Sequence, residues 1–175
     1  TSAGYDEIGI DHFAKPSDGM ARAAKAGSLR RNFQGYTDDT APVLVGLGAS
    51  SISRFPQGFA QNASATAAYT KAIRQGQFST HRGHVFAGED ILRARIIEAL
   101  MCDFRVDREE LLRDFGASNV WIDEKFDAVM VAFPGMLTLT PQALEIPPHA
   151  RPLTRMIAQK FDAYDHGKAR HSGAT

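Results

Sequence analysis

The chain has 175 residues, of which 43% are hydrophobic and 23% charged, a composition typical of a folded globular protein rather than a disordered one. Lysine and arginine number 20, as do aspartate and glutamate, so the zero formal charge gives no overall attraction to nucleic acid or anionic membrane. The single cysteine, Cys102, excludes an internal disulfide framework and a cysteine-rich metal or cluster site built from this chain alone.

No apolar run approaches the roughly 20 residues of a membrane-spanning helix, and the start of the chain lacks the basic and apolar regions of a signal peptide. We therefore expect a cytoplasmic protein without a membrane partner. The length suits one sizeable domain or two small ones. Because residue 1 is threonine, we also expect the chain to be a fragment or a processed product.

The first half of the chain begins with a predicted strand and helix. The loose alternation of residues 5–10 predicts a short strand with polar residues at its C-terminal end. The Ser-Asp-Gly sequence at 17–19 is typical of a helix cap, so an alanine-rich helix is expected up to Gly27. The segment around Phe33 and Gln34 is interpreted as a loop.

A second strand and helix follow. The apolar run 42–48 predicts a buried strand that leads into a glycine loop. Asn62 and Ser64 are alternative caps for a helix through Ile73, with Gly76 as its stop. Two strand–helix units predict parallel pairing. A closed barrel needs about eight strands, so this half is either a small open sheet or the end of a larger barrel.

The polar, glycine-containing stretch 75–88 predicts a boundary between two domains, which we place at 1–82 and 83–175. Beyond it, apolar residues recur at helical spacing and predict a helix from Glu89 to Cys102. The fold class expected for the whole chain is therefore mixed α/β (α+β).

The second domain is expected to continue with two shorter helices, a hairpin and a last helix. Asp107 is a predicted cap for a helix that Gly116 ends, and a further helix is expected over 120–131. Residues 136–146 predict a hairpin. The last helix is expected to present five apolar side chains on one face: Leu153, Met156, Ile157, Phe161 and Tyr164. This order resembles a winged-helix arrangement.

Two neighbouring segments carry the candidate binding residues. Phe33 and Gln34 combine a ring for stacking with an amide that both donates and accepts hydrogen bonds. A buried aromatic with a hydrogen-bonded neighbour is the alternative. The pattern Gly46-x-Gly48-x-x-Ser51 differs from a dinucleotide fingerprint because the third glycine and a prompt helix are missing. A tight turn without a ligand and a close backbone approach to a ligand both remain open.

Several titratable residues suggest other chemistry. Asp6, Asp11 and His12 are candidates for a metal or acid–base site, although His12 also suits a hydrogen-bonded histidine at a strand end. His81 and His84 are interpreted as solvated loop histidines.

Four further features favour structural roles. Cys102 is interpreted as a buried core thiol. Arg105, between two aspartates, either ties a corner between helices or faces a carboxylate-bearing substrate, and we favour the corner. The terminal segment 165–168 is interpreted as a fraying tail. The helix over 120–131 would repel phosphates through three acidic residues set against Lys125, so no nucleic-acid partner is expected. These residues are Asp123, Glu124 and Asp127.

Four separated motifs together resemble the C-terminal part of oxygen-independent coproporphyrinogen III oxidases, which are radical S-adenosylmethionine enzymes of haem biosynthesis. The motifs are residues 8–14 (Ile-Gly-Ile-Asp-His-Phe-Ala), 31–37 (Arg-Asn-Phe-Gln-Gly-Tyr-Thr), 46–53 (Gly-Leu-Gly-Ala-Ser-Ser-Ile-Ser) and 102–107 (Cys-Asp-Phe-Arg-Val-Asp). The resemblance covers nearly the whole chain and is weakest over 115–152.

This resemblance implies an oxidoreductase whose barrel holds a [4Fe–4S] cluster on a Cys-x-x-x-Cys-x-x-Cys motif. Such an enzyme uses S-adenosylmethionine to convert two propionates of coproporphyrinogen III to vinyl groups, giving protoporphyrinogen IX. The cysteine motif is absent from this sequence. The chain would thus be the end of the barrel followed by a winged-helix-like domain, inactive alone because the cluster needs thiolates.

The family binds a second S-adenosylmethionine, and the resemblance implies that Ile52, Phe33 and Gln34 contact the cofactor. It assigns no catalytic residue and no metal ligand in this chain. The substrate partner would be coproporphyrinogen III, the full-length protein is expected to be monomeric, and exposed sheet edges would allow the fragment to self-associate. Two alternatives are a haem-carrying relative of the same superfamily and a stand-alone winged-helix binding module.

Overall fold

The structure, a computed structural model, describes residues 3–164. The chain divides into two compact units. Unit 1 comprises Thr1–Ile8 and Phe13–Gly88, and unit 2 comprises Gly9–His12 and Glu89–Thr175. The predicted assignment of 1–82 to the end of a barrel and of 83–175 to a helical domain stays a prediction. Among the described residues, every helix is too short or too polar to cross a lipid bilayer.

The start of unit 1 follows its local sequence signals. Strands β1 (Asp6–Ile8) and β2 (His12–Ala14) form a two-stranded sheet. Helix α1 (Gly19–Lys25) begins where the Asp18 carboxylate accepts a hydrogen bond from the Met20 backbone N–H at 2.9 Å, which confirms the predicted cap. Gly27, with φ of +66°, ends the helix as expected.

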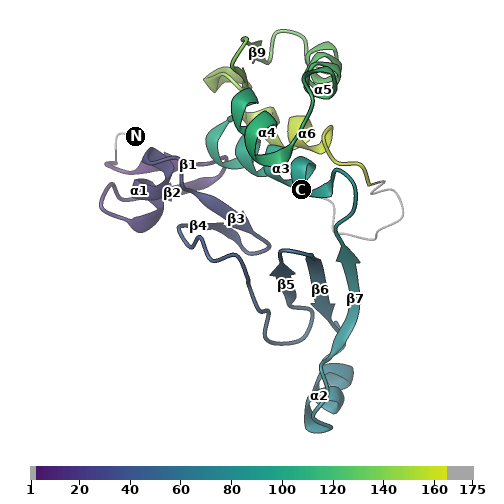
Figure 1. The fold of residues 1–175 in the computed structure, drawn as a ribbon. Coiled ribbons are helices and arrows are strands. Elements are labelled where there is room, and N and C mark those ends of the chain that lie inside the picture. The colour runs from purple at the N-terminus through teal and green to yellow at the C-terminus, as the bar shows by residue number, and fades with distance from the viewer. Residues whose placement is uncertain (1–2, 165–175) are drawn as a thin grey trace. The chain divides into compact units, whose positions relative to one another are not determined.

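A hairpin, a three-stranded antiparallel sheet and one helix follow in unit 1. Strands β3 (Arg30–Asn32) and β4 (Gly35–Thr37) make a hairpin. Strands β5 (Ile52–Phe55), β6 (Gly58–Asn62) and β7 (Thr80–Val85) form a three-stranded sheet in the order β5-β6-β7 (Figure 1). Helix α2 (Thr66–Arg74) connects β6 to β7 and contains no buried side chain.

The prediction of parallel pairing is wrong, because the β3–β4, β5–β6 and β6–β7 pairs are all antiparallel. The strand predicted over 42–48 is also wrong. Only Leu44 forms an isolated bridge, with Arg54, while Val45 and Leu47 are 61% and 85% exposed. Nothing in the described part of the chain covers this run on both faces, as a buried strand requires.

The predicted caps of α2 are also wrong. The helix begins after Ala65 without any side-chain cap. Asn62 is the last residue of β6, and its side-chain amide binds carbonyl groups of the preceding glycine loop instead. The polar stretch 75–88, interpreted as a boundary, contains strand β7.

Unit 2 contains the predicted helices and hairpin. Its elements are α3 (Asp90–Asp103), β8 (Arg105–Asp107), α4 (Arg108–Phe115), α5 (Asn119–Ala132), β9 (Thr138–Leu139), β10 (Ala143–Glu145), the 3₁₀ helix η1 (Pro148–Leu153) and α6 (Thr154–Gln159). Asp107 caps α4 by accepting the Glu110 N–H at 3.1 Å, and Gly116 ends that helix at a φ of +64°. Strand β8, which was not predicted, adds to the hairpin in the sheet order β8-β10-β9.

The hydrophobic core is concentrated in unit 2. Of the twelve largest fully buried side chains among residues 3–164, all except Ile8 and Leu29 lie there. The last helix is shorter than predicted: Ile157 and Phe161 are buried, but Met156 and Tyr164 are 56% and 52% exposed. The predicted single apolar face therefore holds for only part of this segment.

Candidate functional site

The β3–β4 hairpin positions the first two candidate residues. Phe33 and Gln34 form its turn, because Asn32 pairs with Gly35 across the hairpin. The Asn32 side-chain oxygen accepts a hydrogen bond from the Gln34 backbone N–H at 2.8 Å, which fixes the turn locally. The Gln34 side chain is exposed, and Phe33 is 52% exposed. A buried role for Phe33 is thus excluded in this structure.

The Phe33 ring packs on the sheet of unit 1. It meets the ring of Phe59, on β6, edge-on at a centroid distance of 5.0 Å and an interplanar angle of 79°. Phe59 in turn meets Phe86 at 5.0 Å and 90°, and Phe86 contacts the His84 ring at 6.1 Å. These edge-to-face contacts hold the hairpin turn against one face of the sheet.

Ile52 lies on this same face. In antiparallel strands, directly paired residues project to the same side of the sheet, and so do residues two apart in one strand. Ile52 pairs with Gln61, which is two residues from Phe59. The face therefore has two rows of paired residues, one being Arg54–Phe59–His84 and the other Ile52–Gln61–Arg82. We call these six residues the sheet array.

The glycine loop before β5, residues 46–51, is held at the C-terminal end of β6 by hydrogen bonds. The Asn62 side-chain amide donates to the carbonyl oxygens of Gly46 and Gly48 at 3.2 and 3.0 Å. The Gly48 N–H donates to the Tyr69 hydroxyl, and a Cβ on Gly46 would lie 2.8 Å from the Ile52 carbonyl oxygen. Gly46 is thus needed for a close backbone approach, within the protein itself.

This loop leads into strand β5 and not into a helix. A dinucleotide fingerprint places a helix N-terminus directly after its glycines, so the loop lacks the geometry of that site.

The β-bulge between Gln61 and Asn62, where pairing with β7 shifts, leaves His81 as the extra residue. His81 and His84 therefore lie in a strand, which corrects their interpretation as loop residues.

The other titratable candidates have local partners. Asp6 pairs with Lys25 at 2.7 Å, within unit 1. In unit 2, the Asp11 carboxylate contacts His12 Nδ1 at 2.8 Å and Arg155 at 2.7 Å. Among residues 3–164, no group of three or more His, Cys, Asp or Glu side chains is arranged to hold a metal ion.

Cys102 is buried, as expected for a core thiol. Arg105 pairs with Glu145 on the neighbouring strand β10 and with Asp107 at 3.3 Å. Its guanidinium therefore connects strand β8 to strand β10. The pKa of Asp107 is lowered, first because its carboxylate accepts the Glu110 N–H and second because Arg105 donates to it. Residues 165–168, predicted to be a tail, lie outside the described residues.

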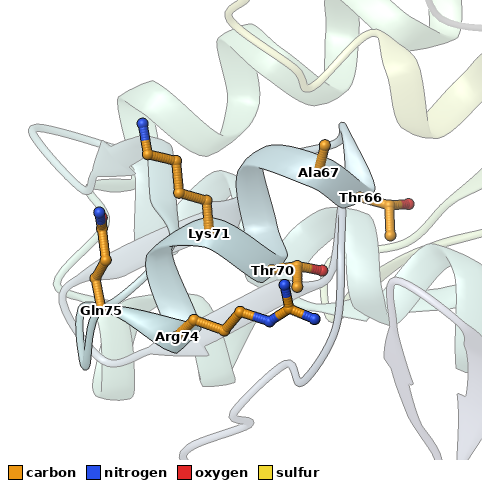
Figure 2. Close-up of a pocket in the computed structure, with 6 residues that line it drawn as sticks. All are labelled: Thr66, Ala67, Thr70, Lys71, Arg74 and Gln75. Atoms are coloured by element: carbon orange, nitrogen blue, oxygen red, sulfur yellow. The ribbon is translucent and has the colours of Figure 1, made fainter.

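A shallow hollow on α2 is unrelated to the sheet array. Figure 2 shows its lining, which comes from this one helix and the residue after it: Thr66, Ala67, Thr70, Lys71, Arg74 and Gln75. No second element contributes a converging group, so the hollow has no arrangement of a binding site.

The structure thus brings Phe33 and Ile52 to one face of one sheet, with Gln34 next to Phe33 in the turn. Sequence reasoning missed Phe59, Arg54 and Arg82. The one signal for them is the spacing of the short segments 52–55 and 58–62, which are separated only by Pro56 and Gln57, as a two-residue hairpin turn requires.

No family model matches the chain. It is 60% identical over 171 residues to the oxygen-independent coproporphyrinogen III oxidase of Paracoccus denitrificans, covering 98% of this chain and 38% of the relative. It is 51% identical over 162 residues to the protein of that name from Cereibacter sphaeroides, covering 93% of this chain and 36% of the relative.

The fold agrees with a solved structure. The chain superposes on coproporphyrinogen III oxidase from Escherichia coli, described as a radical SAM enzyme, with a TM-score of 0.85 and 30% identity. The match covers 93% of this chain and 38% of that protein. The chain therefore spans about two fifths of the length of the relatives that it matches.

Proposed function

From its resemblance to oxygen-independent coproporphyrinogen III oxidases over nearly its whole length, we propose that this chain forms part of such an enzyme. Its contribution would be one wall of an S-adenosylmethionine site in the oxidative decarboxylation of coproporphyrinogen III. The observation that carries this proposal is the placement of Phe33 and Ile52 on one face of the β5-β6-β7 sheet, with Gln34 beside them. The barrel and winged-helix descriptions of the two units belong to the same proposal.

The chemistry of the three side chains suits S-adenosylmethionine. Phe33 presents an exposed ring, and Ile52 is a partly buried aliphatic side chain, so both offer apolar contact to the adenosyl group. The exposed Gln34 amide both donates and accepts, as recognition of a purine edge or a ribose hydroxyl requires. Because the Phe59 ring packs edge-to-face against Phe33, the Phe33 ring is held in place before the ligand binds.

An iron–sulfur cluster does not fit the residues of this chain. Such a cluster needs several thiolates, and the only cysteine, Cys102, is buried in the core of unit 2. We therefore assign no step through a cluster to these residues. Their role is to bind and orient S-adenosylmethionine.

For unit 2 we propose a packing role rather than nucleic-acid binding. The order α3, β8, α4, α5, β9, β10 is compatible with a winged-helix arrangement. A winged-helix protein that binds DNA presents a basic helix to it. Helix α5 instead carries Asp123, Glu124 and Asp127 against Lys125, and Asp123 already pairs with Arg108 at 2.6 Å.

The proposal is tested in the full-length protein with Phe33→Ala and Gln34→Ala. We expect each variant to lose about fivefold in S-adenosylmethionine affinity or turnover, because a stacking contact and an amide hydrogen bond are each worth about 1 kcal/mol. The visible absorbance of the iron–sulfur cluster should not change. Affinity is measured by isothermal titration and turnover by porphyrin fluorescence after oxidation of the product.

Phe78→Ala provides the matched control. Phe78 also lies in unit 1 and is 95% exposed, but it follows α2 and is not part of the hairpin turn or of the sheet array. If Phe33→Ala and Gln34→Ala behave like Phe78→Ala, the three residues do not bind S-adenosylmethionine.

A further inference from the structure

Residues 40–88 contain four basic side chains and no acidic one, although the whole chain is neutral. The basic residues are Arg54, Lys71, Arg74 and Arg82. The segment includes all of the β5-β6-β7 sheet and helix α2. It is therefore a cationic module within a neutral chain, and the remaining residues have four more acidic than basic side chains.

Two of these charges lie in the sheet array. Arg54 is the β5 neighbour of Phe59, and Arg82 is the β7 neighbour of Gln61. They thus occupy opposite corners of the array, with the aromatic and amide side chains between them. Both are exposed on the face where the Phe33 ring packs.

Neither guanidinium is neutralised by a carboxylate within residues 3–164. Arg82 Nε donates to the Gln61 side-chain oxygen at 2.6 Å, a contact that orients the group without cancelling its charge. In unit 2, by contrast, six arginines each pair with a carboxylate: Arg93, Arg95, Arg105, Arg108, Arg113 and Arg155. Within the described residues, the array thus combines two arginines that have no carboxylate partner with the exposed ring of Phe33 on one face.

From this arrangement we infer that Arg54 and Arg82 bind carboxylate groups of the ligand that lies on the Phe33–Phe59 face. Guanidinium groups bind carboxylates through charge-assisted, two-pronged hydrogen bonds, and a ligand with both apolar surface and carboxylates would use rings and arginines together. The Gln61 contact preorganises Arg82 for this role. The inference rests on the proposed function, since it assigns the counter-charges of that same site.

Two ligands of the proposed reaction carry carboxylates. S-adenosylmethionine has one in its methionine part, and coproporphyrinogen III has one on each of its four propionates. Either would supply the anion. The shared chemistry is a carboxylate next to a largely apolar body.

The test uses Arg54→Gln, Arg82→Gln and the double variant of the full-length protein. Binding is measured for two probes: S-adenosylmethionine by calorimetry, and coproporphyrin III, the stable oxidised form of the substrate, by fluorescence. We expect the dissociation constant of at least one probe to rise about three- to tenfold for each single variant and further for the double variant. The tetramethyl ester of coproporphyrin III should show no difference between wild type and variants.

Two controls separate charge at the array from general effects. Arg74→Gln removes the same charge from α2, outside the array, and should change neither dissociation constant by more than about twofold. Arg54→Lys keeps the charge and should recover part of the affinity. Far-ultraviolet circular dichroism verifies that each variant is folded.

The outcomes distinguish the inference from the proposed function. If only the dissociation constant of S-adenosylmethionine rises, the arginines bind the carboxylate of the cofactor. If only the dissociation constant of coproporphyrin III rises, they bind the propionates of the substrate. If wild type binds both probes and the double variant binds them equally well, the arginine assignment is overturned while the proposed function stands. If wild type binds neither probe and has no turnover, the proposed function itself fails, and the arginine assignment fails with it.

Discussion

The Asp107 side chain performs two tasks at one position. Its carboxylate caps α4 through the Glu110 N–H at 3.1 Å and also accepts a hydrogen bond from Arg105. Both interactions favour the ionised form, which lowers the pKa of Asp107 below its ordinary value. A carboxyl group with a lowered folded-state pKa stabilises the fold above its unfolded pKa, and this stability is lost as pH falls through the folded-state value.

We therefore expect Asp107→Ala to lower the free energy of unfolding at pH 7 by about 1 kcal/mol, within a range of about 0.5–2 kcal/mol. The difference from wild type should shrink as pH falls below about 3.9, the ordinary pKa of aspartate. Urea unfolding followed by the fluorescence of Trp121, the only tryptophan, reports on unit 2. Asp107→Asn keeps a capping oxygen and should lose less. An equal loss in both variants, or a loss independent of pH, would contradict this account.

At the scale of elements, the sheet of unit 2 is most deeply buried at its central strand β10, in which Ala143 and Leu144 are both fully buried. Leu144, in β10, pairs with Val106 of β8 and with Leu139 of β9. Leu144 is fully buried in the main hydrophobic cluster, whereas Leu139 is 36% exposed. Leu144 and Val106 therefore both join this sheet to the main hydrophobic cluster, whereas Leu139 contributes less to it.

The substitution Leu144→Ala should lower the free energy of unfolding by about 2–5 kcal/mol, because it removes buried methyl groups and leaves a cavity. Leu139→Ala removes the same atoms from the partner position and should cost less than about 1.5 kcal/mol. Both values come from urea unfolding with Trp121 as the probe. Similar losses for the two variants would mean that β10 does not carry the packing of this sheet.

Sequence could predict those elements that depend on neighbouring residues. The Asp107 cap and the Gly116 stop are both local, so α4 was predicted together with its ends. The β5-β6-β7 sheet was missed because β6 pairs with β7 across the whole of α2, and its strands lack the strong apolar alternation that marks a strand. Phe33 and Ile52 could be singled out by resemblance, but the Phe33–Phe59 contact that joins the hairpin to the sheet has no signal in the sequence.

At the scale of the whole molecule, the two units differ in how much apolar surface they bury. In the part of the chain that the structure describes, ten of the twelve largest fully buried side chains belong to unit 2. In the β5-β6-β7 sheet, only Ser53 and Gly58 are buried, and α2 has no buried side chain. Local stability follows buried apolar contact, so the units should open separately.

Hydrogen exchange of the 175-residue chain should show this difference directly. We expect the slowest amide protons in α3 and α5, and at least tenfold faster exchange in β5, β6 and β7, since about 1.4 kcal/mol of local stability corresponds to a factor of ten. Mass spectrometry of quenched, pepsin-digested samples gives the rates by segment. Equal protection of the β6 and α3 amides would show that the stability of the sheet does not follow from the number of its buried apolar side chains.

The lack of acidic residues between Asp39 and Glu89 also determines where the chain can be cut. A protease that cleaves only after aspartate and glutamate has no site in β5, β6, α2 or β7, so it would release the whole segment as one uncut peptide. Trypsin, in contrast, has sites at Arg54, Lys71, Arg74 and Arg82. The charge pattern from which we infer anion binding at the array thus also keeps this sheet and helix together in one peptide after such a digest.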